Sequence, residues 1–406
     1  MDAAADSQAQ LPTDSIQSSG YPLGFMVTKG TARPSILGAS PARDVVVVEA
    51  RQFGGHQKEA VVREGANGSE WRMVSDEGKH LKGTDLAPFP LGFFNAGIHA
   101  DLGGRIISLA RDRGIALRSL NMDIKTRYSL TGSFTRGDAI GTAEPITIEI
   151  DLGSAATDDD VHKLVSDAAA ASPAIAALRT ALTNTFAIYV NGRRRAVQTL
   201  ASSPSDDAPD PFRTYANPPA PLAGADTLGR LIHKTGIVRE GEITLAPAEA
   251  KTPTIRVITG NSTFEDLSGV VETDTYLSLP GVSHFAMKAD ERTGADQGPC
   301  GLSLIAASIV FCYMTQISRY IEHMKLNIRG TRIVQYWPLA LEDNVALQGV
   351  AEPVDTHLFF SGDESDEVHE KLMTIAARTC YLHATLTAEL TPEIAIIHNG
   401  QAIGQE

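Results

Sequence analysis

An internal repeat constrains the fold of this chain more than any other feature of its sequence. Short identical stretches recur 207 or 208 positions apart: Ala-Glu-Pro at 143–145 and 351–353, Val-His at 161–162 and 368–369, and Asn-Gly at 191–192 and 399–400. Because the offset stays nearly constant over about fifty residues, chance is a poor explanation. The sequence therefore predicts two copies of one structural unit.

A proline-rich segment separates the two copies. Six prolines lie between Pro204 and Pro221, which excludes a helix interior or a central strand and indicates a linker. The 406 residues also exceed one ordinary domain of about 150 residues. We predict a disordered tail over 1–20, a first domain over 21–200, a linker over 201–227 and a second domain over 228–406.

Both copies have the same order of expected elements. Short alternating segments typical of strands come first, followed by a long apolar helix at about 91–113 or 301–325. A strand pair follows, then a second helix with an acidic start that suits the helix dipole, and a last strand ending in Asn-Gly. This order, with helices and antiparallel strands segregated, predicts the α+β class.

Charge and composition exclude several classes of partner. Lys and Arg total 35 against 49 Asp and Glu, for a net charge of −14, so phosphate backbones and anionic lipids would repel the chain. We therefore expect no nucleic-acid and no membrane partner. The longest apolar run, starting at Gly301, is also too short to span a bilayer and is followed by Arg319 and Glu322. The first twenty residues have no secretory pattern, and three cysteines suit a reducing compartment, so we expect a cytoplasmic protein.

The cysteines lie in two segments that are typical of one family. Gly298-Pro299-Cys300-Gly301-Leu302 opens an apolar stretch that ends at Cys312, and Cys380-Tyr381-Leu382-His383 follows later. The first resembles the OsmC/Ohr helix pattern Gly-Pro-Ser-Pro-x-Glu followed by a Leu/Ala-rich run and Cys. The second is similar to that family's Cys-Pro-x-His-x-x-Leu. The resemblance covers about 255–403 well and about 45–192 more weakly.

The resemblance implies a tandem fusion of two OsmC-like domains with a single thiol site. Asp101 stands where Cys312 stands in the second copy, and Ser172 stands where Cys380 stands. Family members are homodimers with active sites at the subunit boundary, so the fused copies would form the same dimer within one chain. We expect the long helices to lie together, and the Gly103-Gly104 pair to allow close approach of the other copy. A homodimer of such pseudo-dimers is a further assembly that the sequence allows.

The resemblance makes Cys312 the peroxidatic residue and Cys380 its partner, while the helix pattern alone also allows a buried, inert Cys312. A reactive thiolate needs a nearby cation, for which Arg292 and Arg256 are candidates, unless both are solvated surface residues. His383 is a candidate base or a core histidine. The glutamate that the family carries after the proline, which orients its arginine, is absent, since Leu302 or Ser303 takes its place.

Three more polar residues invite interpretation. Cys300 lies near the helix start, where the dipole would lower its pKa, although an incidental role is the simpler interpretation. Asp101 would be costly to bury unpaired, and Arg105 at i+4 is its expected partner. An alternative is a second polar site made by Asp101 and His99, although residues two apart do not share a helix face.

The leading functional hypothesis is a cysteine-based reduction of organic hydroperoxides. Cys312 would become a sulfenic acid, Cys380 would condense with it to a disulfide, and an external dithiol would reduce that disulfide. No metal or organic cofactor is expected, and the substrate would be small and hydrophobic. The alternatives are a hydrolase acting on an ester or diketone, and a non-catalytic module that binds an apolar ligand. Peroxide-dependent thiol consumption distinguishes the first from the other two.

Overall fold

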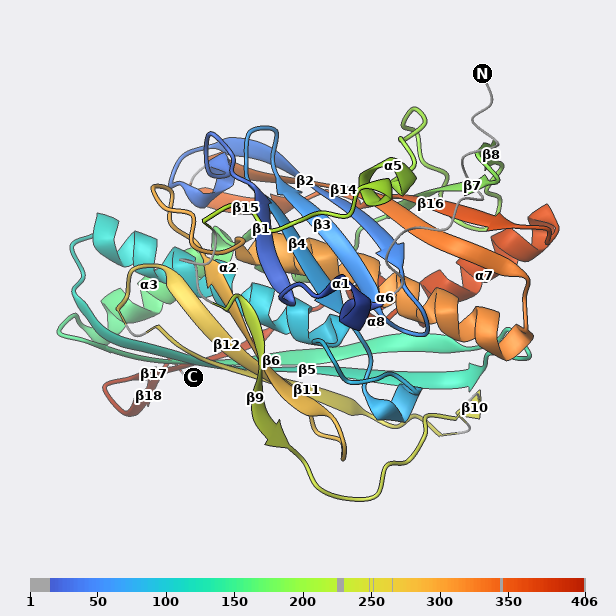
Figure 1. The fold of residues 1–406 in the computed structure, drawn as a ribbon. Coiled ribbons are helices and arrows are strands. Elements are labelled where there is room, and N and C mark those ends of the chain that lie inside the picture. The colour runs from blue at the N-terminus through green and yellow to red at the C-terminus, as the bar shows by residue number, and fades with distance from the viewer. Residues whose placement is uncertain are drawn as a thin grey trace.

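The computed structural model describes residues 15–224, 230–247, 249–250, 252–264, 266–343 and 346–404. Two β-sheets enclose two long helices, α2 (Pro90–Asp112) and α6 (Gly301–Met324), which lie between them in Figure 1. These helices match the predicted ones to within a residue at each end, and the predicted α+β class is confirmed.

The remaining elements follow the predicted order in each half. The first half has the helices α1 (Ile16–Ser19), α3 (Asp158–Ala170) and α4 (Pro173–Arg179) and the strands β1 (Gly24–Thr28), β2 (Ala42–Gln52), β3 (Lys58–Glu64), β4 (Glu70–Ser75), β5 (Leu117–Ser133), β6 (Ile140–Ser154), β7 (Thr185–Val190) and β8 (Arg193–Arg195). After α5 (Phe212–Ala216), the second half has α7 (Asp366–Thr379) and α8 (Tyr381–Thr387) with β9 (Ile232–Val238), β10 (Glu249–Ala250), β11 (Arg256–Thr263), β12 (Val270–Leu277), β13 (Ser283–Asp290), β14 (Ile328–Asp343), β15 (Leu347–Ala351), β16 (Asp355–Gly362), β17 (Glu393–His398) and β18 (Gln401–Ile403). Two 3₁₀ turns complete the described chain, η2 (Ser35–Leu37) and η3 (Lys79–Leu81).

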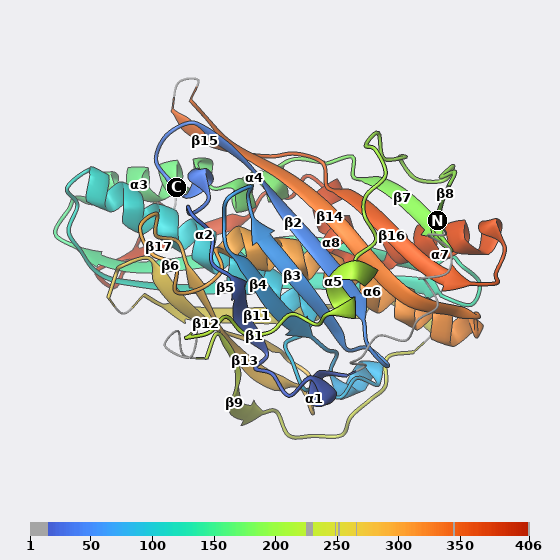
Figure 2. The same ribbon diagram turned by 45° about the horizontal axis from the view of Figure 1, so that its top comes forward.

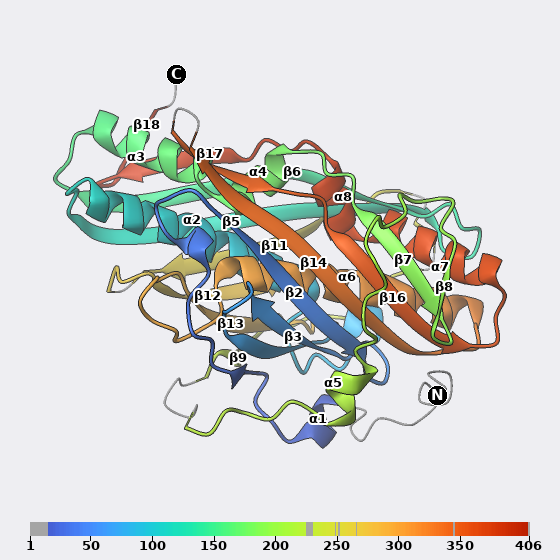
Figure 3. The same ribbon diagram turned by 90° about the horizontal axis from the view of Figure 1, so that it is seen from above.

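Each sheet contains strands from both halves. The first sheet has the order β1-β4-β3-β2-β14-β16-β7-β8, and the second has the order β9-β13-β12-β11-β5-β6-β17-β18. The two orders correspond strand for strand once the halves are exchanged, which is the arrangement of a pseudo-twofold. The junction β2–β14 is antiparallel from Ala42 opposite Leu341 to Arg51 opposite Arg332, and Figure 3 shows the two strands side by side. The domain boundaries stay a prediction, since neither sheet is built from one copy alone.

The two long helices pack with their backbones close together. A Cβ atom on Gly97 would lie 2.6 Å from the carbonyl oxygen of Gly301, so neither position has room for a side chain. The Gly103-Gly104 pair also faces the second half, but there the neighbours are the Phe264 ring and the Glu291 side chain. The closest backbone approach therefore lies nearer the start of both helices than the sequence predicts.

The second helix of each half begins with a capped, acidic first turn, as predicted. The Thr157 side chain accepts from the Asp160 N–H at α3, and the Ser365 side chain accepts from the Val368 N–H at α7. Each of these helices is followed by a short one, whose N-cap residue is Ser172 for α4 and Cys380 for α8. The backbone thus places Ser172 and Cys380 at equivalent positions.

The linker packs against the outer face of the first sheet, where α5 lies (Figure 2). The buried Tyr215 donates a hydrogen bond to the Glu49 carbonyl oxygen at 2.7 Å, and Arg332 forms an ion pair with Asp210 at 2.6 Å.

Near the N-terminus, α1 belongs to the predicted tail, yet Ile16 is buried because it packs with Phe53. Residues 1–14 of that tail and 225–229 around the linker's end lie outside the described residues.

The apolar helix α6 is a core helix. Its length and hydropathy would suffice to cross a bilayer, which differs from the expectation based on its apolar run. However, 94% of its apolar window is buried inside the protein, between the sheets and α2. The burial explains the hydrophobicity, because a helix packed on all sides needs no polar face.

We predict that the Gly97→Ala substitution destabilises the protein, because an added Cβ would force α2 away from the Gly301 backbone. Overpacking of this kind typically costs about 1–3 kcal/mol and would outweigh the better helix propensity of alanine. Thermal unfolding followed by circular dichroism would show a lowered midpoint. Gly294→Ala is the control, since a Cβ there would have no atom within 4 Å. Equal midpoints for the two variants would contradict the close helix packing.

Candidate functional site

A narrow pocket of about 100 Å³ lies between the two halves and contains Cys312. Leu81, Phe89 and Leu91 of the first half and Leu277 of the second make much of its wall apolar. Its polar lining comprises Glu77 and His80 from the first half and Thr254, Arg256, Cys312, Thr315, Gln316, Arg319 and Tyr381 from the second. Neither half could form this pocket by itself.

The fold places the two predicted thiols beside each other, with Cys312 at the pocket wall and Cys380 behind it. Cys312 lies on α6 with 3% of its surface exposed, and Cys380 is fully buried at the N-cap of α8. Burial raises the pKa of the Cys380 thiol well above its ordinary value, and a hydrogen bond to Cys312 raises it further. The Cys380 sulfur also accepts from the His383 N–H at 3.4 Å. Cys380 therefore holds its proton at neutral pH beside Cys312.

Arg319 is the buried cation of the pocket, and the sequence interpretation missed it. It lies two helical turns after Cys312 on α6, and its Nη1 donates to the Gln316 Oε1 at 3.0 Å. Its guanidinium carbon lies 4.3 Å from the centre of the Phe134 ring. The spacing of Cys312, Thr315, Gln316 and Arg319 follows one helix face, so the periodicity that placed Cys312 would also have found Arg319.

The structure separates the two predicted arginines. Arg256, at the start of β11, lines the pocket with Cys312. Arg292 lines a different hollow, beside Gly104, and its Nε and Nη2 donate to the two carboxylate oxygens of Asp290, both at 2.9 Å. Arg292 is held on its own loop by this bidentate pair, which keeps its charge away from the thiols.

A carboxylate from the first half completes the pocket wall. Thr315 donates a hydrogen bond to Glu77 Oε1 at 2.5 Å, and Lys58 donates to Thr315 Oγ1 at 2.8 Å. Burial by itself would raise the pKa of Glu77, but Lys58 and the Thr315 hydrogen bond hold it below the ordinary value. Glu77 is therefore ionised. Its position could not be read from local sequence, because it reaches α6 from the other copy.

His383 faces away from the thiol pocket. Its Nδ1 lies 2.7 Å from the Tyr313 hydroxyl and 3.5 Å from the Asn184 side-chain nitrogen. Burial lowers the pKa of His383 to about 4, so the ring is neutral at physiological pH. The backbone N–H of His383 thus contacts Cys380, whereas the His383 ring contacts Tyr313.

The first half repeats the geometry of the thiol pair with other side chains. Ser172 donates a hydrogen bond to Asp101 Oδ2, which also accepts from the Ala174 N–H at 3.2 Å. Arg105 lies 3.8 Å from Asp101 Oδ1, as its i+4 spacing suggested. Burial raises the pKa of Asp101 despite these contacts. Asp101 and Ser172 therefore correspond to Cys312 and Cys380 in position but not in chemistry.

His99 does not join Asp101 in a second polar site. Its Nδ1 lies 2.8 Å from the Ser262 hydroxyl on β11, and burial lowers its pKa to about 3. The two residues point to different neighbours because they occupy different faces of α2. Arg105 in turn donates to the carbonyl oxygens of Gly38, at 2.8 Å, and Ile36, so the η2 segment closes over the first-half pair.

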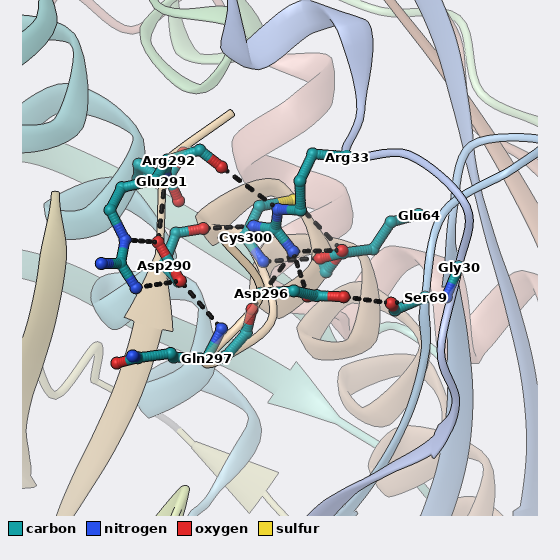
Figure 4. Close-up of polar contacts among 12 residues, drawn as sticks. Gly30, Arg33, Glu64, Ser69, Asp290, Glu291, Arg292, Asp296, Gln297 and Cys300 are labelled. Carbon is teal, nitrogen blue, oxygen red and sulfur yellow. Dashed lines mark hydrogen bonds and ion pairs between the residues drawn. The ribbon is translucent and has the colours of Figure 1, made fainter. Parts of the chain in front are cut away.

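The third thiol belongs to a buried clasp between the halves, shown in Figure 4. Arg33 lies 2.7 Å from Glu64 and 2.7 Å from Asp296, and the Cys300 N–H donates to Glu64 Oε1 at 2.6 Å. Burial, together with Glu64 and Glu291, raises the pKa of Cys300 well above its ordinary value. The expectation of a lowered pKa is wrong, because burial of the thiol, together with the neighbouring carboxylates, outweighs the helix dipole.

One comparison with known proteins supports the resemblance, and it concerns the second half of the chain. A family model described as OsmC-like protein matches residues 294–395, which confirms the resemblance seen in the sequence. A crystal structure of an OsmC-like hydroperoxide resistance protein from Jannaschia sp. CCS1 is 20% identical and covers 33% of this chain and 88% of its own, with a TM-score of 0.25. At that score the likeness does not bear on the fold. No curated protein matches the chain.

We predict that Glu291 makes the protein less stable as the pH rises. Glu291 accepts from the Gly301 N–H at 2.5 Å, and burial and the charge of Asp101 raise its pKa from 4.5 to about 8. Between these values the folded protein keeps a proton that the unfolded chain has released, so stability falls with rising pH in that window. The drop in melting temperature from pH 5 to pH 8 should be smaller in Glu291→Gln by about 2 °C or more. Identical drops would contradict the raised pKa.

Proposed function

Since residues 294–395 match a family model described as OsmC-like protein, we propose that this chain reduces organic hydroperoxides with Cys312 and Cys380. One observation carries the proposal: Cys312 opens into an apolar pocket that also holds Arg319, with Cys380 directly beside it. A nucleophilic thiol, a cation and a second thiol are the groups that a two-cysteine peroxidase requires.

In the first step, the Cys312 thiolate attacks the terminal oxygen of the hydroperoxide. The O–O bond breaks, the alkoxide leaves and is protonated to an alcohol, and the sulfur becomes a sulfenic acid. Arg319 and Arg256 line the same pocket, so their positive charge stabilises both the thiolate and the negative charge that develops on the leaving oxygen. The apolar wall accommodates the organic group of the substrate.

In the second step, Cys380 resolves the sulfenic acid. Its sulfur attacks the Cys312 sulfur, the sulfenic hydroxyl leaves as water with the Cys380 proton, and a disulfide forms. An external dithiol then reduces this disulfide and restores both thiols. The raised pKa of Cys380 supports this division of roles, because a thiol that keeps its proton does not compete with Cys312 for the peroxide.

The hydrolase alternative loses the base that the sequence suggested for it. A cysteine hydrolase uses a base within hydrogen-bond reach of its thiol. His383 was the candidate, but its ring contacts Tyr313. Turnover of an ester or diketone without added thiol would mark the hydrolase, and apolar-ligand binding without turnover would mark the binding module.

We predict that the three cysteines differ in their effect on turnover. Cys312→Ser should abolish hydroperoxide-dependent consumption of a dithiol, because a hydroxyl forms no sulfenic acid. Cys380→Ser should still react once with the hydroperoxide but accumulate the sulfenic acid, which a dimedone-type probe would label on Cys312. Peptide mass mapping of the oxidised wild type should find the Cys312–Cys380 disulfide.

Cys300→Ser is the matched control, because Cys300 lies in the clasp and not in the pocket. It should keep both turnover and the disulfide. A disulfide that includes Cys300 would reassign the resolving role, and undiminished turnover in Cys312→Ser would overturn the thiol mechanism.

We further predict that Arg319→Met slows oxidation of Cys312 by about 100-fold, the effect of removing one preorganised charge from an active site. Stopped-flow measurement with tert-butyl hydroperoxide in a single turnover would give this rate. Asp101→Asn, at the equivalent helix position of the first half, should leave the rate within a few-fold. A collapse of the rate in folded Asp101→Asn would show that the first-half pair takes part in catalysis.

A further inference from the structure

Tyr381 departs from the OsmC sequence pattern and lines the same pocket as Cys312. It directly follows Cys380, where the family motif has proline, and it forms the first residue of α8. Its side chain lines the pocket together with Cys312, Arg256 and Arg319. Tyr381 therefore borders the space that a hydroperoxide bound at Cys312 would occupy.

The ring of Tyr381 is held in place by packing. It stacks on the Tyr128 ring with centres 5.2 Å apart and an angle of 28° between the planes. On strand β6, a Cβ atom on Gly141 would lie 3.2 Å from Tyr381 Cδ1, so the glycine provides the space that the ring occupies. A fixed ring gives its hydroxyl a fixed position in the pocket.

The hydroxyl of Tyr381 has no hydrogen-bond partner within the part of the chain that the structure describes. Two other tyrosine hydroxyls in the interior do have one, since Tyr313 meets His383 at 2.7 Å and Tyr215 meets the Glu49 carbonyl oxygen at 2.7 Å, whereas the hydroxyl of the fully buried Tyr128 has none among the described residues. A partly exposed phenol that lines a pocket, and whose hydroxyl donates to no protein group, can donate a hydrogen bond to a ligand there.

Four other polar groups of the pocket are already engaged or carry no suitable proton. Thr315 donates to Glu77, and Arg319 is bound to Gln316. Glu77 is ionised, and burial lowers the pKa of His80 to about 4. Burial also raises the pKa of Tyr381, while Arg319 and Arg256 act in the opposite direction, so the phenol keeps its proton at neutral pH.

We propose that Tyr381 is a catalytic proton donor to the leaving oxygen of the hydroperoxide, an inference that rests on the peroxidase function proposed above. As the Cys312 thiolate bonds to the terminal oxygen and the O–O bond breaks, the departing alkoxide takes the phenolic proton and leaves as an alcohol. The phenolate is stabilised by Arg319 and Arg256 and regains from solvent the proton that the Cys312 thiol released. The net change is one thiol and one hydroperoxide converted to one sulfenic acid and one alcohol.

The leaving group provides the test. An alkoxide is a strong base that needs a proton, whereas the carboxylate that leaves from a peracid is a weak base that does not. In Tyr381→Phe, which keeps the ring on Tyr128, single-turnover oxidation of Cys312 by tert-butyl hydroperoxide should slow by about 100-fold. Oxidation by peracetic acid should slow by less than about threefold. Tyr336→Phe, on the strand that joins the two halves, is the control and should change neither rate.

Three results would overturn the inference. Equal loss with both oxidants would show that the hydroxyl only supports the pocket's structure. No loss with either oxidant would show that it takes no part in the reaction. If the wild-type protein oxidised with neither, the peroxidase function itself would fail, and the role of Tyr381 with it.

Discussion

The contact between α2 and α6 is the interaction on which the rest of this structure depends. Gly97 and Gly301 let the two helix backbones touch, and each helix carries one half's site residues on the turns that follow. With the helices fixed side by side, each lies within reach of strands from both copies. The thiol pocket, the Asp101 pair and the clasp at Cys300 all lie along this seam.

The exchange of strands explains why the pocket needs both halves. The β5–β6 strands of the first half pair within the second sheet, and β14 and β16 pair within the first. Loops that precede the long helices then meet the opposite helix, as Glu77 meets Thr315 on α6 and Glu291 packs against Gly104 on α2. A wall built from two copies excludes water from the thiols more completely than one copy would, which strengthens the charge interactions inside.

One backbone frame supports two different chemistries. In the second half, the frame holds two thiols with Arg319 opening into a pocket. In the first, it holds Asp101 and Ser172, and Arg105 draws the η2 segment over them. The arrangement in the first half is a closed hydrogen-bonded unit. The fusion of the copies allows this division, because each copy diverges in sequence while the shared helices keep the geometry of the other site intact.

Local patterns in the sequence determined much of this protein. The repeat, the apolar periodicity of the long helices, their acidic successors and the α+β class follow from rules that act over a few turns or strands. The positions of Cys312 and Cys380 at the ends of matching segments carried the family resemblance. Arg319 was equally readable, since it lies on the helix face of Cys312.

Only the tertiary structure decided which groups meet across the two copies. Lys58 on β3 and Glu77 in the loop after β4 reach Thr315 from far away in the sequence, and Arg292 turns to Asp290 instead of the thiols. The pKa of Cys300 likewise depends on Glu64, which the fold brings from the other half. Such contacts follow from the strand exchange and the packing of α2 on α6. Sequence spacing cannot give them, because it fixes neighbours along one element and not the partners that burial forces together.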